Sequence, residues 1–147
     1  MIIRKAIAAD VPEIMNLVRE LAEYEKAPHE VSNTEERMLT EGFGEHPAFE
    51  CILAEKDGEV IGMALYYYRY STWKGRRLYL EDLIVKQAYR GVGAGKLLLD
   101  ETIKIAKAEN CSGMMWQVLD WNEPAINFYK TYNARLDGEW INCHLDF

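Results

Sequence analysis

The fold is decided by the stretch Leu78-Tyr79-Leu80-Glu81-Asp82-Leu83-Ile84-Val85 and by the glycine-rich Arg90-Gly91-Val92-Gly93-Ala94-Gly95 that follows it. The first run is apolar apart from its two carboxylates, which predicts a mostly buried strand. Over residues 96–109 apolar side chains recur at helical intervals. A strand, a glycine loop and a helix in this order expose backbone N–H groups at a helix start, where the helix dipole favours an anion. We therefore expect a phosphate group to bind there.

Two common phosphate-binding motifs do not fit the residues of this loop. A Walker A loop needs glycine at the position of Arg90 and Ser or Thr at the position of Leu97. A dinucleotide fingerprint that begins at Gly91 would need its third glycine at Lys96, and no suitable βαβ unit follows. A glycine-rich turn without a ligand is the remaining alternative.

The rest of the chain alternates between short strands and amphipathic helices. Asp10 and Glu13 predict an N-cap and capping box for a helix whose apolar stripe runs from Val11 to Tyr24. The other predicted elements are strands at residues 1–6, 49–55, 60–68, 114–119 and 140–147 and helices at residues 34–40 and 122–132. The order β α α β β β α β α β predicts a mixed α/β fold around a central sheet.

Composition limits the class of protein. The chain has 147 residues, of which 49% are hydrophobic and 28% charged, so we expect one globular domain. No apolar stretch approaches the roughly 18 residues of a membrane span. The start lacks the apolar core of a secretion signal, and three cysteines without CxxC spacing predict reduced, buried thiols, so we expect a cytoplasmic protein.

Charge is unevenly distributed along the chain. Residues 1–60 carry 14 acidic and 6 basic side chains, whereas residues 61–96 carry 2 acidic and 7 basic ones. The net charge of −7 argues against nucleic-acid binding, which needs a basic face. A basic segment beside an acidic one can hold an anion and a cation together, and solvated surface charge is the alternative.

Two motifs resemble a known family. Arg90-x-x-Gly93-x-Gly95 after the strand resembles the pyrophosphate-binding signature of the GNAT N-acetyltransferases, which bind acetyl-coenzyme A. The segment Asn122-Glu123-Pro124-Ala125-Ile126-Asn127-Phe128-Tyr129-Lys130 resembles the family's later CoA-side helix. Five further blocks, in the family's order, are most similar to the diamine (spermidine/spermine) acetyltransferases and their thialysine-acetylating relatives: residues 21–26, 41–47, 70–76, 78–82 and 118–123.

The resemblance implies the family's fold and ligands. We expect the GNAT-like α/β fold, with a central mixed, mostly antiparallel sheet flanked by helices, as a single domain over residues 1–147. We also expect acetyl-CoA as co-substrate, a small-molecule amine as acceptor, no metal and a homodimer. The residues implied to contact CoA are Leu83, Ile84, Val85, Arg90, Gly91, Val92, Gly93, Ala94, Gly95, Lys96, Asn122, Ala125 and Tyr129.

Acetyl transfer to an amine needs a neutral nitrogen, although an alkylammonium has a pKa near 10.4. The resemblance implies that Glu81 holds the amine and receives its proton. Adjacent residues of a strand face opposite ways, so we expect only one of Glu81 and Asp82 to line the site. An ion pair of Glu81 with Arg76 or Arg77 is the alternative.

The resemblance also implies how the leaving group is handled. Backbone N–H groups of Leu83, Ile84 and Val85 on a splayed strand would stabilise the oxyanion of the thioester carbonyl, and Tyr129 would protonate the CoA thiolate as general acid. A tyrosine buried in the core is the alternative for Tyr129. Asn133 stands where relatives commonly have glycine at the helix end, and asparagine tolerates that left-handed conformation.

The acceptor site is implied by fewer residues. Tyr24, Glu25 and Trp73 match positions that shape the amine pocket of diamine acetyltransferases, and aromatic rings with a carboxylate suit a cation. The three histidines show no metal-ligand spacing. Cys111 has no recognisable histidine partner, so we expect direct transfer in a ternary complex. An acetyltransferase for protein lysines or N-termini and a non-catalytic acyl-CoA-binding module are the alternative functions.

Overall fold

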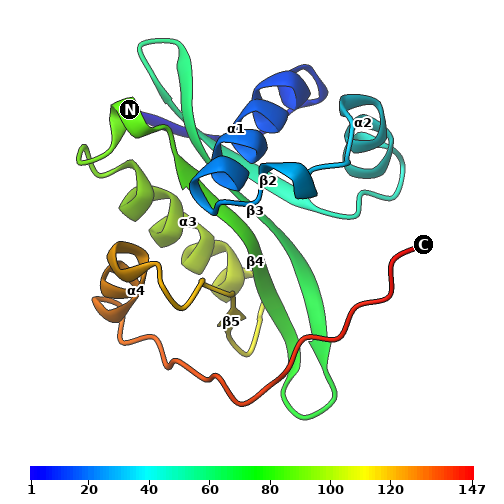
Figure 1. Ribbon diagram of the computed structural model, residues 1–147, viewed down its shortest axis with the longest axis vertical. Coiled ribbons are helices and arrows are strands. Elements are labelled where there is room, and N and C mark those ends of the chain that lie inside the picture. Colours follow the sequence, from blue (N-terminus) through cyan, green and yellow to red (C-terminus); the bar gives the residue numbers. More distant parts are fainter. The chain divides into compact units, whose positions relative to one another are not determined.

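The computed structural model describes all residues 1–147, which form two compact units, Met1–Gln117 and Val118–Phe147. The first unit contains a five-stranded sheet in the order β1-β2-β3-β4-β5 (Figure 1). Its strands are β1 (Ile2–Lys5), β2 (Glu50–Lys56), β3 (Glu59–Ser71), β4 (Gly75–Val85) and β5 (Met114–Met115). Neighbouring strands are antiparallel except for the parallel pair β4 and β5. The predicted mixed, mostly antiparallel sheet is confirmed.

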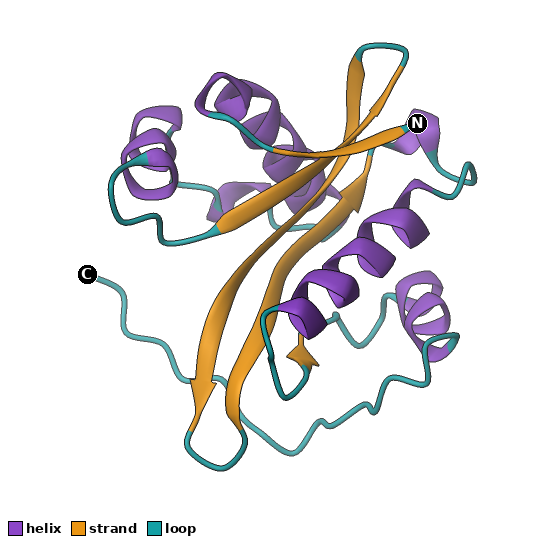
Figure 2. Ribbon diagram, turned by 180° about the vertical axis from the view of Figure 1, so that it is seen from behind, coloured by secondary structure: helices purple, strands orange, loops and turns teal.

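Helices cover both faces of this sheet. The helices α1 (Val11–Tyr24) and α2 (Glu35–Phe43) lie on one face and α3 (Ala94–Ala108) on the other (Figure 2). The apolar stripe of α1 buries Ile14 and Leu17 completely, and α3 does the same with Leu98. Each stripe recurs at helical spacing, so burial against the sheet accounts for the helix.

The predicted capping box of α1 is wrong. The Asp10 side chain does not cap α1, because both of its oxygens are engaged elsewhere. It accepts hydrogen bonds at 2.8 Å from the two terminal nitrogens of Arg4 and one at 2.7 Å from the Ile7 N–H. Asp10 therefore joins β1 to the short 3₁₀ turn η1 (Ala8–Asp10) that precedes the helix.

Two hairpin turns set the register of the sheet. Asp57 and Gly58 have φ of 52° and 79°, which is the conformation of a two-residue turn between right-twisted strands. The β3–β4 hairpin is much longer and extends past the end of β2 (Figure 1). At its tip the Ser71 hydroxyl oxygen accepts hydrogen bonds from the N–H groups of Trp73 and Lys74.

The second unit contains one helix, α4 (Glu123–Lys130). The predicted strand at residues 140–147 is wrong, and the one predicted at 114–119 is reduced to two residues of β5. A strand forms only where its N–H and C=O groups pair with a neighbouring strand, and no strand is assigned within residues 134–147. No helix of either unit has the length and apolar composition of a membrane span.

Candidate active site

The glycine loop lies between the 3₁₀ turn η3 (Gln87–Tyr89) and the start of α3. Gly91 and Gly93 have φ of 85° and 88°, which is a left-handed conformation that side chains with a Cβ rarely adopt. Gly93 is the N-cap of α3, and no side chain caps the helix. Backbone N–H groups of the first turn are therefore free of side-chain caps, which is the arrangement that an anion site at a helix start needs.

The residues of this loop differ in what they expose. Val92 is exposed, whereas the Ala94 side chain is buried, so Ala94 can offer only its backbone to a ligand. Gly95 lies near the end of β4, where an added Cβ would be 3.8 Å from Val85 Cγ2. The Lys96 ammonium pairs with Asp100 at 2.7 Å on the exposed side of α3.

Arg90 faces back toward α1. Its Nε donates a hydrogen bond to the Val85 carbonyl at 3.2 Å, and its guanidinium lies over the ring of Tyr24. Tyr24 is the last residue of α1. The structure therefore brings together Arg90, predicted at the CoA site, and Tyr24, predicted at the amine site.

One edge of β4 is open next to this loop. β5 ends its pairing with β4 at Tyr79, so the following residues have no strand on that side. The Lys86 N–H donates to β3 at 2.8 Å, and the alternation of antiparallel bonds then directs the Ile84 N–H to β3 as well. The N–H groups of Leu83 and Val85 face the open edge. Of the three amides predicted to contact the thioester, these two are available and that of Ile84 is not.

A β-bulge interrupts β4 at Glu81. Leu80 pairs with Tyr66 and Asp82 pairs with Leu65, so the backbone of Glu81 has no register partner on β3. An extra residue of this kind leaves the ladder locally unpaired and changes the direction of a side chain.

The bulge brings Glu81 and Asp82 to the same face of the sheet. Tyr79 lies opposite Tyr67, and Glu81 follows two residues later on the same face. Asp82 lies opposite Leu65, which shares the face of Tyr67 because the two are two residues apart. The expectation that only one carboxylate faces this side is wrong, because strict alternation holds only along a regular strand.

A third carboxylate comes from the end of α1. This helix covers the same face, where Ile84 and Ile14 share one core cluster. Burial, together with the charges of Glu81 and Glu25, raises the pKa of Asp82 to about 7. Burial also raises the pKa of Glu25. Because the charges of Glu81 and Glu25 disfavour ionised Asp82, a cation beside them would favour its ionised form.

Aromatic rings border these carboxylates. The rings of Tyr67 and Tyr79 lie 5.2 Å apart. Burial raises the pKa of Tyr67, and the charge of Glu81 and a hydrogen bond to it raise it further. Arg76 and Arg77 do not pair with Glu81. Arg76 lies 3.9 Å from a Glu109 oxygen and 4.0 Å from the centroid of the Tyr68 ring, and Arg77 donates to Ser112 Oγ and the Met114 carbonyl.

Trp73 does not join this group within one chain. It lies at the tip of the β3–β4 hairpin with 86% of its surface exposed. Gly75, at the start of β4, is six residues from Glu81, which corresponds to about 20 Å of extended strand. Trp73 and Glu81 of the same chain therefore do not line one pocket.

The remaining predicted residues lie in the second unit. Asn122 caps α4, and its Oδ1 accepts a hydrogen bond from the Ala125 N–H at 3.4 Å. Tyr129 is half-buried on the same helix, where its ring contacts Phe128. Asn133 has φ of 58°, which confirms the left-handed helix end.

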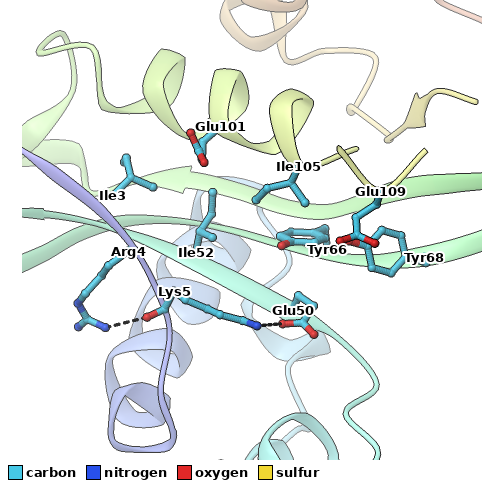
Figure 3. A pocket seen from close by; sticks show the side chains of 10 residues that line it. All are labelled: Ile3, Arg4, Lys5, Glu50, Ile52, Tyr66, Tyr68, Glu101, Ile105 and Glu109. Atoms are coloured by element: carbon cyan, nitrogen blue, oxygen red, sulfur yellow. Dashed lines mark hydrogen bonds and ion pairs between the residues drawn. The ribbon is translucent and has the colours of Figure 1, made fainter. Parts of the chain in front are cut away.

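A separate groove of about 510 Å³ lies on the α3 face of the sheet (Figure 3). Ile52, Tyr66 and Ile105 give it an apolar lining, and Lys5 pairs with Glu50 at its border at 3.2 Å. No predicted site residue lines it.

The three cysteines are free and only Cys51 is buried, so the expectation of three buried thiols is wrong. No group of three His, Cys, Asp or Glu side chains could hold a metal ion.

Sequence reasoning missed the contribution of Asp82 and the contacts of Tyr67. A bulge shifts the pairing of two strands, and a single strand's sequence carries no signal for it. The adjacent carboxylates of an otherwise apolar strand were the only available sign.

Comparison of the sequence with known proteins identifies relatives of this chain. Residues 12–133 match the model of the acetyltransferase (GNAT) family. The chain is 44% identical over 142 residues to thialysine N-epsilon-acetyltransferase of Sus scrofa, covering 91% of this chain and 84% of that protein. It is 39% identical over 139 residues to spermidine/spermine N(1)-acetyltransferase-like protein 1 of Homo sapiens, covering 90% of this chain and 20% of that protein.

The fold recurs in solved structures. A mutant Bacillus halodurans protein superposes with a TM-score of 0.82 at 22% identity, covering 99% of both chains. A match at this identity concerns the fold alone, whereas the family model and the first relative each span most of the chain. This protein belongs to the GNAT family of acetyltransferases.

Proposed function

We propose that this acetyltransferase moves the acetyl group of acetyl-CoA to a primary amine of a small cationic aliphatic molecule, by direct transfer in a ternary complex. The observation that carries the proposal is the gathering of Glu25, Glu81 and Asp82 on one face of the sheet, beside the open edge of β4. A carboxylate cluster attracts an amine cation more strongly in a partly dry site than in bulk water.

The carboxylates have separate roles in this proposal. Glu81 receives the proton that the reacting ammonium must lose, directly or through water. Asp82 and Glu25 bind the second cationic group of the acceptor. Because their pKa values are raised by burial, an arriving cation favours their ionised forms and so strengthens its own binding.

In this proposal the glycine loop and α4 act on acetyl-CoA. The loop from Arg90 to Lys96 holds the pyrophosphate, and the N–H groups of Leu83 and Val85 stabilise the oxyanion as the amine nitrogen attacks the thioester carbon. The C–S bond then breaks, and Tyr129 gives its proton to the thiolate. Asn122 and Ala125 place the first turn of α4.

The names of two relatives point to the acceptor class. One relative is named as a thialysine acetyltransferase and the other as a protein like spermidine/spermine acetyltransferase. The acceptors in both names are aliphatic molecules with more than one amine. We propose that thialysine is at least as good a substrate as spermidine.

We also propose a homodimer. Trp73 lies too far along its own hairpin to reach Glu81, so any role in the amine pocket requires the hairpin of a second copy. The hairpin carries the basic residues Arg69, Lys74 and Arg76, whereas residues 1–60 are strongly acidic. The hairpin of one copy would therefore be attracted to residues 1–60 of the other. Sedimentation analysis of wild-type protein and Trp73→Ala tests this arrangement, and a monomeric wild type would contradict it.

One experiment tests the proposed function. CoA release is followed with thialysine, spermidine, putrescine, lysine and a lysine peptide, and kcat/KM is compared. We expect kcat/KM for the small polycations to exceed that for the peptide clearly. Glu81→Gln should lower turnover with every amine, because Glu81 is the proposed proton acceptor. A clear preference for the peptide would favour a protein acetyltransferase. CoA binding without turnover of any amine would favour a non-catalytic acyl-CoA-binding module.

A further inference from the structure

The segment between β4 and the glycine loop is held by carboxylates from two other elements. It consists of Lys86 and η3, and it leads directly into Arg90. From α1, Glu20 Oε1 accepts a hydrogen bond from the Gln87 N–H at 3.0 Å. From the end of the β2–β3 turn, Glu59 accepts a hydrogen bond from the Tyr89 hydroxyl. We name the contacts of Glu20, Glu59, Lys86, Gln87 and Tyr89 the loop clamp.

Lys86 completes the loop clamp. Its Nζ lies 3.4 Å from a Glu59 oxygen and 3.5 Å from a Glu13 oxygen, and its side chain is only 23% exposed. Its N–H donates to the Ile61 carbonyl at 2.8 Å. One lysine thus joins α1, β3 and the segment that precedes the glycine loop.

The charge of these carboxylates works against the ligand expected next to them. Glu20 and Glu59 are negative, and CoA brings a pyrophosphate to the adjoining loop, so Coulomb repulsion weakens its binding. Their hydrogen bonds instead fix the positions of Gln87 and Tyr89.

Position matters because glycine residues permit many backbone conformations. Gly91 and Gly93 lack a Cβ and adopt left-handed φ values, so an unrestrained loop would lose much conformational entropy on binding. Fixing its upstream end reduces that cost before the ligand arrives.

We propose that the loop clamp positions the glycine loop for acetyl-CoA, with Glu20 and Tyr89 as positioning residues that touch neither substrate. This inference rests on the proposed function. It predicts a specific loss of CoA affinity when the loop clamp is opened, with the chemical step left intact.

Three variants separate position from charge. Tyr89→Phe removes one hydroxyl and keeps the ring. Glu20→Ala removes the acceptor for the Gln87 N–H, and Glu20→Gln keeps an oxygen that can accept the same bond. CoA affinity is measured by calorimetry, and KM for acetyl-CoA is compared with kcat. We expect Tyr89→Phe and Glu20→Ala to raise the CoA Kd and the KM about 3- to 10-fold, with kcat unchanged and Glu20→Gln within about twofold of wild type.

The sign of the Glu20→Ala effect is decisive. Loss of a negative charge near an anion site alone would tighten CoA binding. Glu23→Ala removes the same charge from an exposed position of the same helix and is the matched control, for which we expect unchanged or tighter binding. Thermal unfolding of each variant shows whether stability changes in parallel.

The outcomes distinguish the two proposals. Wild-type Kd values in Tyr89→Phe and Glu20→Ala, with or without a lower Tm, would overturn the positioning role and leave the proposed function standing. A wild-type chain that fails to bind CoA would refute the proposed function, and the role of the loop clamp with it.

Discussion

The guanidinium carbon of Arg90 lies 4.9 Å from the ring centroid of Tyr24. Arg90 begins the glycine loop, and Tyr24 ends α1 directly before Glu25. One cation–π contact therefore joins the loop proposed to bind CoA to the side chains proposed to bind the amine. Such a contact is worth about 0.5–1 kcal/mol at an exposed site.

Replacing the ring of Tyr24 should weaken CoA binding. Tyr24→Leu removes the π face that orients Arg90, and we expect a rise of about two- to fivefold in the CoA Kd. Tyr24→Phe keeps the π face and should bind as wild type does. Calorimetry with CoA measures both, and equal Kd values for the two variants would show that the ring does not orient Arg90.

Gly93→Asp should abolish CoA binding. The position has φ of 88°, so any side chain strains the loop, and aspartate adds a negative charge where the pyrophosphate is expected. Gly58→Asp is the matched control, because Gly58 has φ of 79° and open space around it in the β2–β3 turn. Calorimetry should find CoA binding in this control only. Unchanged affinity in folded Gly93→Asp would refute the assignment of the loop.

Tyr129→Phe should lower kcat by about 100-fold or more, with CoA affinity within a few-fold of wild type, because in the proposed mechanism the hydroxyl acts only to protonate the leaving thiolate. Tyr132→Phe is the control, since Tyr132 also contacts the ring of Phe128. Steady-state kinetics with saturating acetyl-CoA measures the effect. A wild-type kcat in Tyr129→Phe would reduce Tyr129 to a packing residue.

Asp82→Asn should stabilise the protein at pH 8 while impairing amine binding. Burial raises the pKa of Asp82 to about 7, so the folded state holds a proton that the unfolded state has lost between about pH 4 and 7. The free energy of unfolding therefore falls as pH rises through that window.

We expect Asp82→Asn to gain about 1–2 kcal/mol at pH 8 and to equal wild type near pH 4, measured by urea unfolding. In the wild type, kcat/KM for the diamine should rise between pH 6 and 8 as Asp82 ionises. An amine KM unaffected by Asp82→Asn would remove Asp82 from the acceptor site.

Asp10→Asn should destabilise the first unit at neutral pH. The hydrogen bonds from Arg4 hold the pKa of Asp10 below its usual range, so this stabilisation is complete above about pH 4 and is lost as pH falls through the folded-state pKa. We expect a loss of about 2 kcal/mol at pH 7 and a smaller one at pH 3.

The exposed pair of Lys5 with Glu50 provides the contrast. Lys5→Gln should change the free energy of unfolding by less than about 0.5 kcal/mol. Urea unfolding at both pH values measures these differences, and equal losses for Asp10→Asn and Lys5→Gln would contradict the importance of the partly buried Arg4–Asp10 pair.

The sequence by itself determined the elements whose signals are local. The strand that ends at Val85, the glycine loop and α3 follow from apolar periodicity and from glycines at positions that only glycine fills easily. The cap of Asn122 and the left-handed Asn133 follow from the preferences of those residue types at helix ends. Each of these depends on interactions within a few residues, so the order of side chains suffices to predict it.

The tertiary structure decided whatever depends on a partner strand or helix. Glu81 and Asp82 share a face of the sheet because a β-bulge shifts the register between β3 and β4. The sequence of a single strand does not encode that shift. Residues 140–147 alternate like a strand, but they form no strand in this fold. The loop clamp joins Glu20, Glu59 and Tyr89 from three distant segments. Contacts between distant segments arise from packing and register, which is why the position of these groups became visible only in the folded chain.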